Sequence, residues 1–469
     1  MSERKISLIP YDPEAHFVPA HPSRTVVCQL RMDVGKASEK ISNFRAISPQ
    51  DKIAYLPTGD LWSARSVDGV LEPVPLNDEH GEPLLDDRGN RRTMQASKWL
   101  ALYRRCEQMS WVPGRPMLIP DQLLLDGGMI DRPGVKIFNL YRPPALKRGS
   151  TKLAGPWLDH IQKIYPDEAE HLLNWFAHRV QRPSEKINHA VVLGGAQGIG
   201  KDTLLEPVKR AVGAWNFAEV GPQQILGRFN GFLKSVILRV SEARDLGEID
   251  RFTFYDRTKT LMAAPPDVLR VDEKFLREYA IPNCVGVVIT TNHRTDGLYL
   301  PPEDRRHFVA WSDARREDFP AEYWRELYAW LDSGGDGHVA AWLAERDLSG
   351  FDPKAPPQKT PAFWAIADAG RAPEDAELAD VIDAIGRPPA IAMSRLQSAA
   401  SGDFADWLQD RKNRRVIPHR LEVAGYQPIR NPTAESGLWV AHGKRQVIYA
   451  RTNLSAAERL VAAREITRA

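Results

Sequence analysis

The stretch that decides the fold is residues 190–212, which read AVVLGGAQGIGKDTLLEPVKRAV. It opens with a short run, Ala190 to Leu193, that is apolar at every position, as expected of a strand buried on both faces of a parallel sheet. A glycine-rich turn follows, and the residues from Leu204 to Val212 are predicted to form a helix. The order of strand, glycine loop and helix predicts an α/β domain with a mainly parallel sheet.

The glycine loop predicts phosphate binding. Glycines let backbone N–H groups turn inward around a phosphate, the next helix presents its positive end, and Lys201 can reach the terminal phosphates. We therefore expect ATP and Mg²⁺ as cofactors. The residue after such a lysine is usually Ser or Thr, and here it is Asp202 with Thr203 next, so both stay candidates for the magnesium ligand. The residues expected to hold the nucleotide are Gly195, Gln197, Gly198, Ile199, Gly200, Lys201, Asp202 and Thr203.

Two further apolar runs, Val236 to Val240 and Val285 to Thr290, predict neighbouring parallel strands. Hydrolysis needs a carboxylate at a strand tip, to orient water and help hold the metal, and Glu242 is the candidate. Ser241 stands where a second acid would be usual. Asn292 follows the other run and is the candidate sensor of the γ-phosphate.

Arg305 and Arg306 come shortly after this strand. An arginine that reaches across a subunit interface can stabilise the charge on the transferred phosphoryl group. Either residue could take this role, and ordinary salt bridges are the alternative.

These motifs, in this order, resemble superfamily 3 helicases. The chain looks like the helicase portion of phage and plasmid primase-polymerases, which are related to poxvirus-type primase-helicases. The resemblance covers about residues 50–315, is strongest over residues 170–312, and rests mainly on five stretches of sequence. They are Gly195 to Thr203, Val236 to Arg244, Asp272-Glu273-Lys274, and Thr290-Thr291-Asn292 followed by Glu303 to Phe308.

The resemblance implies an AAA+-like P-loop NTPase core and an ATP-dependent DNA helicase of phage or prophage replication. It also implies a homo-oligomeric ring, expected to be a hexamer, that moves on single-stranded DNA. Lys274, with Arg270 nearby, would grip the DNA from a hairpin. No paired-aspartate primase motif is evident, so a separate primase is a possible partner. The alternatives are a P-loop nucleotide kinase and a non-motor, ATP-dependent DNA-binding replication initiator.

The pattern along the chain predicts five segments. We expect an α+β region at 1–150, a helical collar at 151–188, the ATPase domain at 189–350, a Pro-rich linker at 351–369, and a C-terminal domain at 370–469.

The C-terminal segment is locally basic. Nine Lys or Arg residues and two acidic residues lie between 411 and 451, which is typical of a nucleic-acid-binding surface. A predicted helix from Pro418 to Ala424 and a basic hairpin suggest a winged-helix-like domain. The candidate DNA contacts there are Arg414, Arg415, Arg420, Lys444 and Arg445.

Composition restricts the remaining classes. The hydrophobic fraction of 43% and charged fraction of 26% are ordinary for a globular protein. Three cysteines without CxxC spacing predict free thiols, not a zinc site or a disulfide framework. No apolar run reaches membrane-spanning length. We therefore expect a cytoplasmic location in a bacterial or phage-infected cell, without membrane contact.

Overall fold

The protein is described by a computed structural model that covers residues 40–78, 80–241, 251–294, 298–369 and 373–468. Its centre is a five-stranded sheet in the order β11-β12-β15-β10-β16, with all neighbouring strands parallel. The strands are β10 (Ala190–Gly195), β11 (Phe217–Val220), β12 (Ile237–Val240), β15 (Gly286–Thr291) and β16 (His307–Ser312). The predicted mixed α/β fold with a parallel sheet is confirmed.

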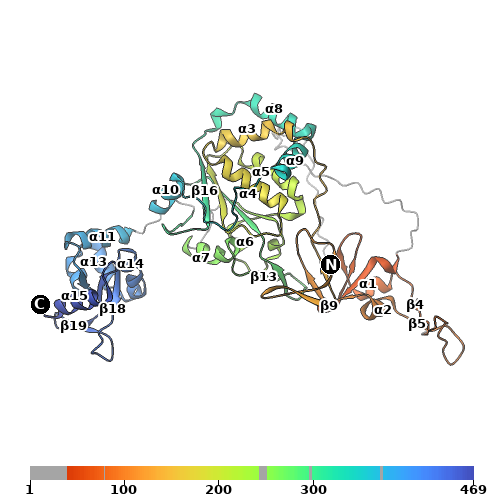
Figure 1. Ribbon diagram of the computed structural model, residues 1–469, viewed down its shortest axis with the longest axis horizontal. Helices are drawn as coiled ribbons and strands as arrows, with labels where there is room; N and C mark the ends of the chain where they lie inside the picture. Colours follow the sequence, from red (N-terminus) through yellow and green to blue (C-terminus); the bar gives the residue numbers. More distant parts are fainter. Residues whose placement is uncertain (1–39, 79, 242–250, 295–297, 370–372, 469) are drawn as a thin grey trace, which may run out of the picture.

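Helices cover the sheet because its strands are apolar on both faces. Helices α3, α4, α5 and α9 contact one another and form a layer, seen together above the sheet in Figure 1. Helix α7 contacts β15, and α10 contacts β16. The helices of this body are α3 (Gly155–Ile164), α4 (Ala169–Gln181), α5 (Lys201–Val212), α6 (Pro222–Ile225), α7 (Arg251–Met262), α8 (Ala321–Trp330), α9 (Asp336–Glu345) and α10 (Pro361–Ala369).

Helix α10 corrects the predicted linker. Proline content predicted a linker over 351–369, but residues 361–369 form this helix, and Phe363 and Ile366 are buried in the main core. The Thr360 hydroxyl donates to the Val309 carbonyl of β16 at 2.7 Å and accepts from the Phe363 N–H. The apolar spacing of the helix therefore outweighs the prolines that precede it.

The N-terminal region contains two small sheets. One has the order β3-β2-β1-β6 and packs with two helices, and the other has the order β7-β9-β8. A short pair, β4 and β5, forms the base of an arm that projects at the lower right of Figure 1. The elements are β1 (Phe44–Ile47), β2 (Lys52–Tyr55), β3 (Asp60–Trp62), α1 (Ala64–Asp68), β4 (Val74–Pro75), β5 (Thr93–Met94), α2 (Ala96–Tyr103), β6 (Arg105–Cys106), β7 (Gln108–Ser110), β8 (Leu118–Leu125) and β9 (Gly128–Asn139).

A hairpin of β13 (Val268–Val271) and β14 (Tyr279–Pro282) extends from the central body to this region. The Ser110 hydroxyl of β7 donates to the buried Ala280 carbonyl at 2.8 Å. The Gln50 side chain exchanges two hydrogen bonds with the backbone of Arg277. The N-terminal region therefore holds the hairpin in place.

The C-terminal domain has its own apolar clusters, separate from the main core. A three-stranded sheet, β17-β21-β18, packs with helices, and β19 and β20 form a hairpin. The predicted helix is present as α14. A basic hairpin is also present, but its second strand is Lys444–Gln446, after a two-residue turn at His442-Gly443, and not the expected run Gln446–Ala450, most of which lies in β21 of the three-stranded sheet. The elements are α11 (Pro373–Ala384), β17 (Ala390–Ala392), α12 (Met393–Ala399), α13 (Gly402–Gln409), α14 (Ile417–Val423), β18 (Tyr426–Ile429), β19 (Trp439–Ala441), β20 (Lys444–Gln446), β21 (Ile448–Arg451) and α15 (Ala456–Arg468).

Candidate active site

The glycine loop joins the end of β10 to the start of α5. Three of its glycines have positive φ: 140° at Gly195, 84° at Gly198 and 93° at Gly200. A Cβ atom on Gly200 would lie 2.6 Å from both His160 and Trp324, so this position requires glycine for space as well as for its backbone. Ala196, Gln197 and Gly198 are exposed at the tip of the loop, while Ile199 is buried beneath it.

Lys201 begins α5 and is only 9% exposed. Its ammonium group donates to the carbonyls of Gly195 (2.7 Å) and Ala196 (2.8 Å) and to the Asn292 side-chain oxygen (2.8 Å). Burial lowers the pKa of Lys201 to about 8, while the nearby Asp202 carboxylate acts in the opposite direction. The lysine is therefore held over the loop by three acceptors.

Asn292 reaches Lys201 because of the strand order. Strand β15 lies directly beside β10, and Thr291 is in register with Gly194, so the residue after β15 falls beside the glycine loop. The structure thus brings together two residues that the sequence predicted as parts of one site and that lie 91 positions apart.

The predicted carboxylate, Glu242, lies outside the described residues. Strand β12, which precedes it, ends at Val240 in register with Ile289 of β15. The tips of β10, β12 and β15 therefore lie along the same edge of the sheet.

Asp202 and Thr203, the candidate magnesium ligands, each have a polar partner. The Asp202 carboxylate is 79% exposed and forms an ion pair with Arg239 of β12, and the Thr203 hydroxyl lies 3.0 Å from the Tyr328 hydroxyl. The described residues hold no cluster of three or more His, Cys, Asp or Glu side chains that could bind a metal unaided. Each residue offers an oxygen of the kind that Mg²⁺ takes as a ligand, and each contacts a different element, β12 for Asp202 and α8 for Thr203.

Arg239 was not predicted from the sequence. Its side chain is 14% exposed and pairs with Asp202 and also with Glu219 of β11, the latter at 3.0 Å. The arginine interrupts an otherwise apolar strand, and this irregularity is the signal that could have identified it.

A cluster of aromatic side chains lies beside the start of α5. His160 of α3 is fully buried, and its ring nitrogens lie 3.1 Å from the Gly200 carbonyl and 2.6 Å from the Tyr323 hydroxyl. Burial lowers the pKa of His160 to about 4, so the imidazole is neutral near pH 7. The rings of Phe319 and Trp324 also pack against the His160 ring. These residues come from segments on both sides of the loop in sequence, so no local motif indicates them.

Arg305 and Arg306 lie away from the glycine loop of their own chain. They precede β16, and Ala190 at the start of β10 donates its N–H to the Arg306 carbonyl at 2.8 Å. Because β10 and β16 are parallel, both arginines lie at the end of the sheet opposite Lys201. They line a cavity of about 520 Å³ with Asp304, Tyr255 and His419.

The predicted DNA-gripping residues lie on the β13–β14 hairpin. Lys274 and Phe275 are exposed at its tip, with the ammonium 5.2 Å from the Phe275 ring centroid. Phe275 is 84% exposed, which is unusual for a large apolar side chain. Arg270, on β13, is half-exposed and forms an ion pair with Asp126.

The basic residues of the C-terminal domain differ in their surroundings. Lys444 and Arg445 are exposed on β20, and Arg414 is exposed before α14. Arg420 is mostly buried and paired with Glu374 and Asp375, so acids of its own domain balance its charge. The side chain of Arg415 lies outside the described residues. Cys106 and Cys284 are free and buried, as predicted, and Cys28 lies outside the described residues.

Comparison with known proteins shows which solved structures share the fold of this chain, but it does not show an activity. The Family of unknown function (DUF5906) matches residues 193–306, from the end of β10 to the start of β16. No curated protein matches the chain. Among the described residues, no helix combines the length and apolarity needed to cross a membrane.

The solved structures that resemble the chain include the apo C-terminal region of NrS-1 (305–718). It aligns with a TM-score of 0.56 and 15% identity, over 87% of this chain and 95% of that one. The A form apo structure of that region aligns with a TM-score of 0.56 and 15% identity, over 87% of this chain and 97% of that one. A JCV helicase bound to a small molecule gives only 0.30 and 10%, over 51% and 66%, which supports no argument. The chain therefore shares the mixed α/β fold of the NrS-1 C-terminal region along most of its length.

Proposed function

We propose that this protein is an ATP-driven translocase that forms a ring and moves on single-stranded DNA during replication. The observation that carries the proposal is the contact between Lys201 and Asn292 at the glycine loop. A lysine and a polar strand-tip residue, joined at the start of a helix, suit the binding and sensing of a terminal phosphate.

Mg²⁺ would supply charge neutralisation between the phosphates. Thr203 and Asp202 are the described residues that would help to hold it, and Glu242 is the proposed carboxylate for the attacking water. Lys201 would exchange its loop carbonyls for phosphate oxygens. The neutral His160 and its aromatic neighbours would keep the start of α5 rigid and partly dry.

The DNA-binding part of the proposal rests on the hairpin tip and the C-terminal domain. Lys274 and Phe275 combine a cation with an exposed ring, the pair of groups that single strands bind through phosphate and base. In the C-terminal domain, α14 followed by the β19–β20 hairpin has the order of a winged helix. Lys444 and Arg445 on that hairpin would contact the DNA backbone.

The test is ATP turnover by the full chain, measured with and without single-stranded DNA. A translocase is expected to be stimulated by the single strand, whereas a nucleotide kinase would ignore it and an initiator would prefer a specific duplex. Lys201→Ala should abolish turnover, and Glu242→Gln should retain ATP binding while stopping hydrolysis. Normal turnover in either variant would contradict the site.

A further inference from the structure

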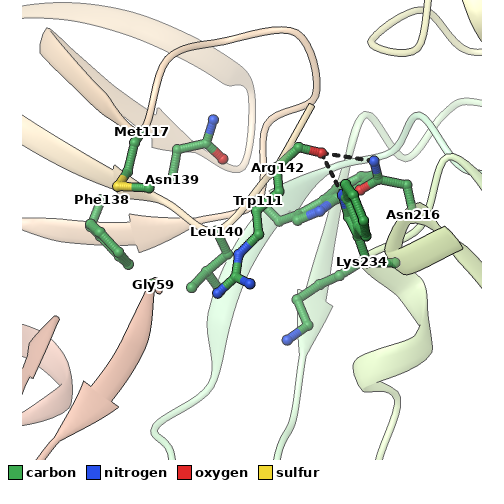
Figure 2. Close-up of a pocket in the computed structure, with 10 residues that line it drawn as sticks. Gly59, Trp111, Met117, Phe138, Asn139, Leu140, Arg142, Asn216 and Lys234 are labelled. Atoms are coloured by element: carbon green, nitrogen blue, oxygen red, sulfur yellow. Dashed lines mark hydrogen bonds between the residues drawn. The ribbon is translucent and has the colours of Figure 1, made fainter. Parts of the chain in front are cut away.

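A cavity of about 240 Å³ lies between the N-terminal region and the central body (Figure 2). The turn at Gly59 and the end of β9 contribute one side, and Trp215, Asn216 and Lys234 contribute the other. It lies beside the starting ends of β11 and β12, opposite the edge that carries Lys201. It is therefore a separate site from the glycine loop.

Trp215 gives this cavity a fixed and accessible aromatic ring. The side chain is 53% exposed, yet its indole N–H donates to the Arg142 carbonyl at 2.9 Å. The Asn216 amide donates to the same carbonyl and also to the Val212 carbonyl, so the short turn that carries the indole is held at the end of α5. A fixed, exposed ring favours stacking because little conformational entropy is lost on binding.

Two cationic side chains point into the same space in Figure 2, those of Arg142 and Lys234. Within the part of the chain that the structure describes, the Arg142 guanidinium has neither an ion pair nor a hydrogen-bond partner. A Cβ atom on Gly59 would lie 2.7 Å from that guanidinium, so the glycine lets the turn approach it closely. An arginine next to a stacking ring matches the phosphate and base of one nucleotide.

Lys234 connects the cavity to the β13–β14 hairpin. Its ammonium group pairs with Glu273 at 2.8 Å, and Glu273 also accepts from the Tyr279 hydroxyl at 2.5 Å. Glu273 directly precedes Lys274 and Phe275 at the hairpin tip. An ion pair and a hydrogen bond therefore connect the cavity to the hairpin that carries the exposed tip. We expect a nucleic-acid strand that binds at the tip to continue into the cavity.

From these observations, we propose that the cavity binds one nucleotide of single-stranded nucleic acid. The base stacks on Trp215, and an adjoining phosphate contacts Arg142. The volume is slightly below the roughly 300–1,000 Å³ of ordinary small-molecule pockets, which suits one nucleotide of a longer strand. This proposal rests on the proposed function in one respect only, namely that the nucleic-acid strand passes the β13–β14 hairpin.

The test is binding of a labelled oligothymidylate to the full chain by fluorescence anisotropy, without ATP. Trp215→Ala should weaken binding by roughly tenfold, which is within the range for loss of one stacked base. Trp215→Phe keeps a ring and should restore most of the affinity. Arg142→Ala should weaken binding and reduce the slope of log affinity against log salt by about one.

Matched controls are Trp364→Ala, which removes another exposed tryptophan (42%) outside the cavity, and Arg148→Ala, which removes an exposed arginine of the same connecting segment. Equal affinities for Trp215→Ala and Trp364→Ala would overturn the proposal. A competition experiment gives a second such outcome. If thymidine monophosphate displaces the labelled oligomer as strongly, per nucleotide, as unlabelled oligomer does, the site serves free nucleotides and the proposal is wrong.

A second measurement uses the wild-type protein, so it does not depend on whether the variants fold. An oligonucleotide carrying 5-iodouridine, irradiated on the wild-type protein, should cross-link to the peptide that contains Trp215. Cross-links confined to other peptides would contradict the site. The irradiation is done without ATP, so the result is independent of whether the chain hydrolyses ATP.

Discussion

At the scale of single residues, Lys201 is the group whose environment most affects the proposed chemistry. Its ammonium is nearly buried and satisfied by two loop carbonyls and Asn292. Among the described residues, no carboxylate contacts it directly, so burial, opposed only in part by the nearby Asp202, lowers its pKa to about 8. Only the charged form attracts a triphosphate strongly.

Nucleotide affinity should therefore depend on pH. A bound phosphate favours the charged lysine and raises its pKa, so binding takes up a proton above pH 8 and weakens as pH rises. Affinity for a non-hydrolysable ATP analogue, measured by calorimetry, should fall about tenfold between pH 7 and pH 9. Lys201→Arg, which stays charged, should bind with little change over this range. A flat profile for the wild type would show that Lys201 does not meet the phosphates.

Sequence alone could propose individual site residues where a motif is local. Lys201 follows its glycines directly, and Asn292 follows an apolar strand, so both could be proposed from pattern alone. His160 and Trp215 could not, because their roles depend on contacts between segments distant in the chain. The partners of Arg239 depend on such contacts as well, although its charge within an apolar strand was a signal in the sequence. Trp215, for example, is fixed by the carbonyl of Arg142, 73 positions earlier.

At the scale of elements, α4 is anchored to the sheet through a buried arginine. Arg179 is fully buried and donates to the Cys284 carbonyl at 2.7 Å, just before β15, and to the carbonyls of Arg182 and Glu185. A Cβ atom on Gly286 would lie 2.7 Å from the Arg179 side chain, so glycine at the start of β15 makes room for it.

Arg179→Ala should therefore destabilise the protein by about 3 kcal/mol or more, because it leaves buried carbonyls without donors and opens a cavity. The free energy of unfolding can be measured by urea denaturation. Arg182→Ala, a half-exposed neighbour on the same turn, is the control and should change stability by less than about 0.5 kcal/mol. Similar losses in the two variants would refute the anchoring role.

The elements with uniform apolar runs were the ones that sequence could predict. The strands β10, β12 and β15 match such runs, and the helices α3 and α4 lie in the predicted helical collar, where apolar residues recur at helical spacing. Only the apolar end of strand β9 could be recognised from the sequence, because Asp131, Arg132, Pro133 and Gly134 interrupt the pattern before it. Pairing with β8, and not its own pattern, extends it to twelve residues.

At the scale of the whole molecule, the arginine pair and the glycine loop lie at opposite ends of the sheet. Strand β10 has six residues, so it separates them by roughly 20 Å. Arg305 and Arg306 therefore do not reach the glycine loop of their own chain along this path. If either acts in hydrolysis, it acts on the site of a neighbouring protomer.

Mixing experiments can test this arrangement. Arg306→Ala added to wild type at increasing ratios should reduce ATP turnover more steeply than in proportion, because each variant protomer inactivates a neighbour's site. The control is Lys201→Ala mixed in the same way, with mass in solution measured alongside in the presence of nucleotide. A strictly proportional loss with Arg306→Ala would place its action within one chain.

The bracing of the hairpin by the N-terminal region affects how this protein can be divided. Residues Gln50 and Ser110 satisfy backbone groups of the hairpin that are more than 160 positions away. A fragment that starts at the helical layer, near residue 151, would keep the glycine loop but leave the Ala280 carbonyl and one side of the hairpin uncovered. Such a fragment is expected to aggregate, because residues 40–150 support the hairpin as well as forming sheets of their own.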